Sequence, residues 1–195
     1  MSITPPVDHP VITRLWDEHS AAITKYTEPG RHYHNMDHLN SLVTIIHDMN
    51  RTHPDTDLEK MVLAGIYHDA VYIPGGMDNE EKSAEYALRS ILDKNTALDV
   101  YDIIVSLRDN QTYGDRETMI VMDADLSILA GDDEQYRSFS DGIRAEWWHL
   151  SDDEYAVERG EVLRRLLSGN IYHLLDREWE SRARYNIRWE LDSLH

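Results

Sequence analysis

The chain contains no cysteine, so disulfide bonds and thiolate metal sites are excluded. Any metal would have to be held by His, Asp or Glu side chains. Long apolar runs are also missing, since no stretch approaches the roughly 20 apolar residues that a membrane-spanning helix requires. Gly/Ser-rich linkers and internal repeats are absent as well. The 195 residues are therefore predicted to form one domain, residues 1–195, with a sizeable core.

Basic side chains are scarce relative to acidic ones. The chain has 19 Lys and Arg against 37 Asp and Glu, a formal net charge of −18. This charge disfavours nucleic-acid polymers and anionic membranes as partners. Small anionic substrates remain compatible with it, because a bound cation can invert the local field. Residues 1–10 lack the pattern of a signal peptide, and we expect a cytoplasmic protein.

Apolar residues recur at spacings of three and four along most of the chain, and no segment sustains the alternation of a strand. The first expected helix follows Pro10 and runs to about Tyr26. Further helices are expected at about 39–49, 58–72, 78–92, 97–107, 118–129, 134–150, 153–167 and 176–191. The polar segment 108–116 is expected to be a loop. The predicted fold class is all-α, a single bundle of about eight or nine helices.

A histidine and an aspartate end the most apolar of these helices. His68 and Asp69 follow the run from Met61, and the breaker 73–76 comes after them. Burying both groups is costly unless something satisfies them. A divalent cation would do so, because imidazole nitrogen and carboxylate oxygen are good ligands for Zn, Mn or Fe.

Two further stretches carry groups that could complete such a site. His34 and His38 are four residues apart, so both imidazoles share one face if a helix begins near His34. Either histidine could then bind a metal, and a polar loop with scattered histidines is the alternative. Asp123 and Asp125 lie in an apolar helix, about 200° apart around its axis, so only one can point at a shared metal. Periodicity does not choose between these two carboxylates.

The order of these blocks resembles that of the HD superfamily of metal-dependent phosphohydrolases. Within it the chain is similar to a small bacterial group of predicted HD phosphohydrolases. The likeness is carried by segments 33–38, 68–69, 78–84 and 123–126, and it runs from about Arg31 to the C-terminus. It implies an HD-like helical bundle with a motif core at about 31–130 and a helical C-terminal extension at 131–195.

The cyclic-nucleotide phosphodiesterases, a distant branch of the same superfamily, have similar Tyr-His-Asn, His-Asp and Ala-Asp-Leu-Ser blocks. The resemblance implies that His38, His68, Asp69 and Asp125 bind the metal and that His34 is the general acid. An alignment with simpler HD proteins would place His34 on the metal instead. With Asp125 as the implied ligand, Asp123 becomes a core residue or a support for the metal ligands.

Two departures from the family pattern bear on a second metal. Ala70-Val71-Tyr72 stands where the phosphodiesterases carry a further Asp-His pair, and segment 108–113 lacks the additional histidines with which many HD hydrolases help to hold a second ion. We therefore expect one divalent ion (Mn, Fe, Zn, Ni, Co or Mg), with a second ion weakly bound or absent.

Charged residues beside the motifs are candidates for supporting roles. Glu81, or less readily Glu80, could orient or deprotonate a water, although acids are also common in the first turn of a helix. Arg31 and Lys82 are the nearest cations that could hold a substrate phosphate. For Lys82 a surface position is the simpler interpretation.

The predicted function is metal-dependent hydrolysis of a phosphomonoester or phosphodiester. By analogy with the family, the expected substrate is a nucleotide or another small phosphorylated metabolite, and the sequence leaves room for a homodimer. Two alternatives remain at this stage. One is a non-catalytic module that binds a metal or ligand. The other is a metal-dependent oxygenase, which the missing histidines disfavour.

Overall fold

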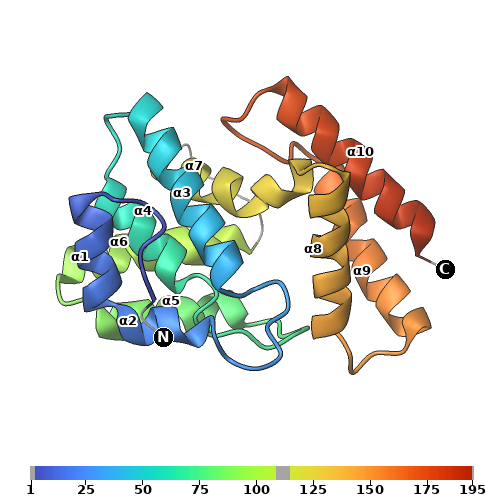
Figure 1. Ribbon diagram of the computed structural model, residues 1–195, viewed down its shortest axis with the longest axis horizontal. Coiled ribbons are helices and arrows are strands. Elements are labelled where there is room, and N and C mark those ends of the chain that lie inside the picture. Colours follow the sequence, from blue (N-terminus) through green and yellow to red (C-terminus); the bar gives the residue numbers. More distant parts are fainter. Residues whose placement is uncertain (1–2, 109–114, 195) are drawn as a thin grey trace.

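The computed structural model describes residues 3–108 and 115–194, and all regular secondary structure in these ranges is helical. The prediction of an all-α fold is confirmed. The elements are α1 (Pro10–Glu18), α2 (Ser20–Lys25), α3 (Met36–Thr52), α4 (Leu58–Tyr67), α5 (Asn79–Ser90), α6 (Lys94–Leu107), α7 (Arg116–Asp125), the 3-10 helix η1 (Leu126–Ala130), α8 (Asp133–Glu146), α9 (Asp152–Leu167) and α10 (Arg177–Ser193). Figure 1 shows α1 to α7 gathered on one side of the molecule and α8 to α10 on the other.

Three of the expected helices end or divide at positions that the apolar periodicity did not predict. The first is interrupted at His19, whose backbone leaves the helical region, so α1 and α2 are separate and the described residues hold ten α-helices. The helix expected to reach Tyr72 ends at Tyr67, and the one expected to reach Leu129 changes to a 3-10 helix after Asp125. The predicted loop at 108–116 falls largely on residues 109–114, outside the described residues.

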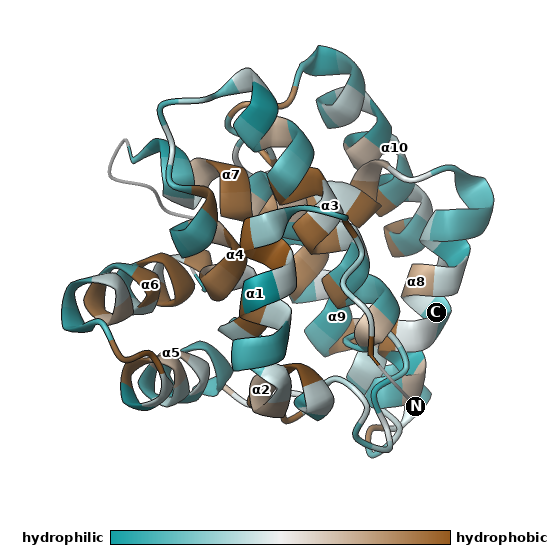
Figure 2. Cartoon of the chain, turned by 60° about the vertical axis from the view of Figure 1, so that its left-hand side comes forward, coloured by the Kyte–Doolittle hydropathy of each residue, from teal (hydrophilic) through white to brown (hydrophobic). Residues whose placement is uncertain are grey.

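Two apolar clusters build the interior. The first joins side chains of α1 to α7, and the second joins α8, α9 and α10 with η1. Every residue of α4 from Met61 to Tyr67 is buried, and Figure 2 shows this helix as a hydrophobic element at the centre of the first cluster. Because α4 is buried on all sides, the residues that follow it emerge inside the molecule rather than at its surface.

A glycine allows α4 to pack closely against α3. A Cβ atom at Gly65 would lie 2.5 Å from Cδ2 of Leu42 and 3.3 Å from Cδ1 of Ile46. Gly65→Ala is therefore expected to lower the free energy of unfolding by about 1–2 kcal/mol, because overpacking outweighs the better helix propensity of alanine. Urea denaturation measures the change. Gly169→Ala is the control, since nothing lies within 4 Å of a Cβ there; an equal loss in both variants would contradict the packing argument.

The second cluster is held together by a buried ion pair. Nε of Arg159 in α9 donates to Oε1 of Glu190 in α10 at 2.7 Å, and the hydroxyl of Tyr136 in α8 donates to Oε2 at 2.6 Å. Arg159 and Glu190 are both buried. One carboxylate therefore joins α8, α9 and α10 into a single unit.

Within residues 3–108 and 115–194, no helix combines the length and the apolar content that crossing a membrane requires.

Candidate metal centre

Side chains from three helices converge on one point. His38 lies in the first turn of α3, His68 directly follows α4, and Asp125 is the last residue of α7. The Nε2 atoms of His38 and His68 are 3.1 Å apart, and Oδ1 of Asp125 lies 3.3 and 3.4 Å from them. Together these three residues could hold a metal ion.

Asp69 stands beside this group. Its Oδ2 lies 3.0 Å from Nε2 of His68 and 3.7 Å from Nε2 of His38. Two ligands that each lie about 2.1 Å from a shared ion are about 3.0–3.4 Å apart when they subtend 90–109° at the ion. Most of the observed separations fall in or near that range. The spacing and chemistry of His38, His68 and Asp125 therefore fit one divalent cation, and Asp69 lies beside these three residues.

The tautomer of His68 is set by the helix that carries it. Its Nδ1 lies 2.8 Å from the backbone carbonyl of Gly65, which can only accept a hydrogen bond. Nδ1 therefore carries a proton, so Nε2 is the atom that the neutral ring would offer to a metal. A carbonyl that orients the far side of an imidazole in this way is typical of metal-binding histidines.

The carboxylates of Asp69 and Asp125 make the electrostatic environment of the cluster favourable for positive charge. Burial disfavours the charged form of His68, but Asp69 and the other nearby groups outweigh burial and raise the pKa of His68 well above its ordinary value. The pKa of Asp69 and that of Asp125 are lowered, because the histidines stabilise their charged forms despite burial. Burial and the neighbouring His68 lower the pKa of His38, so this ring favours its neutral, ligating form. A divalent cation would supply the positive charge that these carboxylates favour.

His34 faces the same cluster from outside α3. The helix begins at Met36 with Asn35 as its N-cap, so His34 lies in the preceding turn and is not positioned by helical spacing. Its Nδ1 is 2.6 Å from Oε2 of Glu146, and its Nε2 is 3.9 Å from Oδ2 of Asp69. A carboxylate only accepts, so Nδ1 carries the proton and Nε2 is directed at the cluster.

Glu146 is the functional candidate that the sequence interpretation missed. It is the last residue of α8 and is fully buried. Its carboxylate accepts hydrogen bonds from the backbone N–H groups of Tyr33 and His34, from the His34 ring and from the hydroxyl of Tyr72. These bonds outweigh the effect of burial and lower the pKa of Glu146 to about 2. The C-terminal unit thus fixes the orientation of His34.

Asp123 and Asp125 point to different places, as helical geometry requires. Asp123 is buried, and its carboxylate accepts from the backbone N–H groups of His173, Leu174 and Leu175 at 2.7–2.8 Å. Three amide donors satisfy the charge without a metal. Asp123 therefore ties the segment before α10 to the helix that carries Asp125.

Replacing Asp123 tests this structural role. Asp123→Asn leaves the metal-centre side chains unchanged but puts an amide NH2 where amide N–H groups already converge. We expect the free energy of unfolding to fall by about 2–4 kcal/mol, because charge-assisted hydrogen bonds to buried groups are lost. Denaturation with metal analysis measures both effects. Metal retained in the folded variant fits the assignment, whereas metal lost with unchanged stability would contradict it.

The two glutamates of α5 differ in their surroundings. Glu81 pairs with Arg108, so its predicted role at the reacting water has a competing contact. Burial raises the pKa of Glu80, and among the nearby charges Asp69 and Asp125 raise it while Arg108 lowers it. Glu80 and Glu81 therefore both remain candidates for a proton acceptor.

The two predicted phosphate-binding cations have other partners. The guanidinium of Arg31 donates to the backbone carbonyls of His34 and Asp69 at 3.1 and 2.7 Å, and its side chain is only 4% exposed. Arg31 thus holds the two motif segments together, and its role in substrate binding stays a prediction. Lys82 is paired with Asp78 at 2.8 Å on an exposed turn of α5, which fits the surface interpretation.

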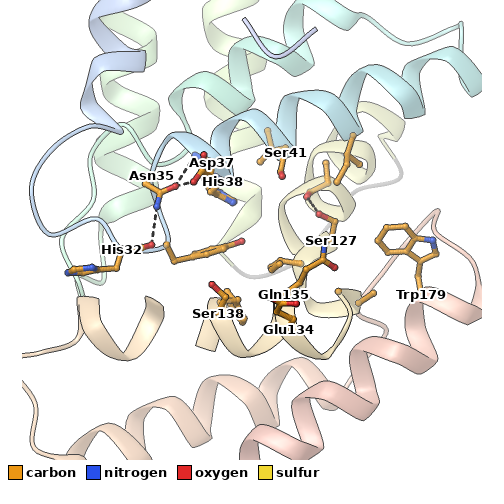
Figure 3. A pocket seen from close by; sticks show the side chains of 18 residues that line it. His32, Asn35, Asp37, His38, Ser41, Ser127, Glu134, Gln135, Ser138 and Trp179 are labelled. Atoms are coloured by element: carbon orange, nitrogen blue, oxygen red, sulfur yellow. Dashed lines mark hydrogen bonds between the residues drawn. The ribbon is translucent and has the colours of Figure 1, made fainter. Parts of the chain in front are cut away.

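A groove of about 610 Å³ lies beside the centre. We call it the α3–α8 groove, because α3 and α8 provide its two long walls, with η1 and Trp179 of α10 closing one end. His38 lines the groove and also belongs to the metal centre. Figure 3 shows His32 and His38 toward one end of the groove and Trp179 at the other.

Comparison with known proteins identifies no relative, since no family model, curated protein or solved structure matches this chain.

Proposed function

We propose that this protein is a metal-dependent phosphohydrolase that acts on a small phosphomonoester or phosphodiester. The observation that carries the proposal is the convergence of two imidazole Nε2 atoms and an aspartate from three helices, with Asp69 beside them. In this proposal His38, His68, Asp69 and Asp125 hold the ion. A bound divalent ion would lower the pKa of a coordinated water and offset charge on phosphoryl oxygens.

His34 is the proton donor to the leaving oxygen. Its Nδ1 is held by Glu146 and its Nε2 is directed at the cluster, so the ring can be doubly protonated there. Burial lowers the pKa of His34, but the charges of Asp69 and Glu146 outweigh burial and leave that pKa raised. A raised pKa keeps the donor form populated near neutral pH, which is what general-acid catalysis requires.

Glu80 is the proton acceptor in this proposal. Its pKa is raised by burial and by the neighbouring carboxylates, which makes it more basic than an exposed glutamate. Glu81 remains the alternative from the sequence, with Arg108 as its partner.

Metal analysis followed by a phosphate-release screen tests the function. Protein purified without chelator is assayed for bound metal, and then for turnover of phosphomonoesters and phosphodiesters with Mn, Mg, Co, Ni, Zn and Fe. We expect stoichiometric metal and release of phosphate or an alcohol that depends on it. Stoichiometric metal without turnover of any ester would favour a non-catalytic binding module instead.

A further inference from the structure

Both long walls of the α3–α8 groove carry polar side chains, next to apolar ones such as Leu42 and Phe139. Asp37 and Ser41 are four residues apart on α3, and Glu134 and Ser138 are four apart on α8. Residues at this spacing share one face of a helix. The space that these residues line has a volume of about 610 Å³. That volume is in the range of sites for small molecules.

The lining of the groove selects against negative charge. Among the described residues that form it, none is Lys or Arg, while Asp37 and Glu134 are acidic. A second phosphate or carboxylate would have no cation to pair with here and would be repelled by both carboxylates. Hydroxyl groups, in contrast, can donate to carboxylates and exchange hydrogen bonds with Ser41 and Ser138. Trp179 adds a flat apolar face at the far end, 37% exposed.

The groove shares a wall with the metal centre. His38 lines it directly, and Ala124, the residue before Asp125, lines it from α7. The ring of Tyr33 also lines the groove, and its centroid lies 4.8 Å from that of the His38 ring and 4.9 Å from that of the His34 ring. A molecule bound in the groove therefore lies against His38, one of the proposed metal ligands.

We propose that the α3–α8 groove binds the organic part of the phosphoester and that this part carries hydroxyl groups and no negative charge, as in a sugar or polyol monophosphate. The proposal rests on the proposed function and narrows its substrate class. A substrate with a chain of phosphates would place charge against Asp37 and Glu134, and the groove disfavours it.

The absence of cysteine makes the groove directly testable. Ser138→Cys introduces the only thiol of the chain, inside the groove, with little change of volume. Ser181→Cys places a matched thiol on the exposed surface of α10, outside the groove. The rate of alkylation by N-ethylmaleimide is measured with Mn present, for each variant, with inorganic phosphate, sugar and polyol monophosphates, or tripolyphosphate added.

A sugar or polyol monophosphate is expected to slow alkylation of Ser138→Cys by about tenfold at about ten times its dissociation constant. Inorganic phosphate and tripolyphosphate should have little effect, and Ser181→Cys should react at a constant rate. Alkylation by a bulky maleimide should then raise KM for sugar and polyol esters in Ser138→Cys alone. Protection by tripolyphosphate, or no protection by any ester, overturns the groove assignment. Metal-dependent phosphate release by the unmodified parent is scored separately, so the proposed function stands or falls independently.

Glu134→Lys gives a second readout that needs no thiol. The added cation in the groove should improve binding of tripolyphosphate as a competitive inhibitor by several-fold, because it removes one repulsion and adds one attraction. Glu158→Lys makes the same change of charge on an exposed position of α9 outside the groove. An equal gain in both variants would reflect net charge alone and would contradict the assignment.

Discussion

His68→Ala is expected to abolish stoichiometric metal binding. Nε2 of His68 lies within 3.4 Å of His38, Asp69 and Asp125, so its loss removes the group that contacts all the others. It also leaves two acidic side chains without the imidazole that stabilises them. Asp125→Asn should have the same effect on binding, because it removes the carboxylate that both histidines face. Metal analysis of protein purified without chelator measures occupancy.

Thermal unfolding gives a second measure of the same prediction. A ligand at about 100 times its dissociation constant stabilises by about 2.7 kcal/mol, which for this size of chain is about 5–10 °C in Tm. The parent should lose this increment on treatment with chelator, and His68→Ala should not respond to chelator at all. His149→Ala is the control for non-specific binding in a chain with eleven histidines, because His149 is exposed and outside the cluster. Full occupancy in His68→Ala would contradict the metal centre.

The parts of the site that the sequence predicted are those with a local signal. His68 and Asp69 stand at the end of an apolar helix, where polar groups need a partner, and in the structure His68 is buried and Asp69 is half-buried. Asp123 and Asp125 could not be separated by periodicity, because both faces of α7 are apolar. The structure separates them by their partners, the amides of 173–175 for one and the histidines for the other.

The sequence interpretation missed Glu146 because its partner His34 lies 112 residues away in the chain. The position of Glu146 in the apolar pattern of α8 is nevertheless unusual. The buried face of α8 runs through Tyr136, Phe139 and Ile143, at spacings of three and four. Glu146 occupies the next position of that stripe, where an apolar residue is expected. A carboxylate at an apolar position must be satisfied by donors from elsewhere. Glu190 follows the same rule on α10, after Ala183 and Ile187, and its partner is Arg159.

The hydrogen bonds of Arg31 to backbone carbonyls could not be predicted from its position beside the motif. A cation near a proposed phosphohydrolase site suggests phosphate binding, but contact with backbone carbonyls depends on how the segments before α3 and after α4 approach one another. Those carbonyls belong to His34 and Asp69, so Arg31 supports the site by positioning two of its residues.

His34→Asn is expected to keep the metal and to lose roughly 10²–10⁴-fold in turnover. His38 belongs to the group of three residues that could hold a metal ion, and His34 does not. Nε2 of His34 is 3.9 Å from Oδ2 of Asp69. The loss should shrink for a substrate with a good leaving group such as p-nitrophenolate, which needs little protonation. His38→Asn should instead lose the metal and, with it, activity on every ester. An equal loss on good and poor leaving groups in metal-replete His34→Asn would remove the acid role.

Glu146→Gln separates the proton donor from its support. A general acid works in its protonated form, so turnover falls as the pH rises through the pKa of His34. Burial lowers that pKa, and the charges of Asp69 and Glu146 raise it beyond this effect. Removing the charge of Glu146 should therefore move the alkaline limb of the pH profile to lower pH, while metal occupancy stays at the parent level. Tyr72→Phe removes one hydrogen bond to Glu146 but keeps its charge, so its alkaline limb should stay close to that of the parent. If the limb is unmoved in Glu146→Gln and the leaving-group dependence of the parent persists, Glu146 serves only to hold the turn before α3, and the proton comes from a group that it does not touch.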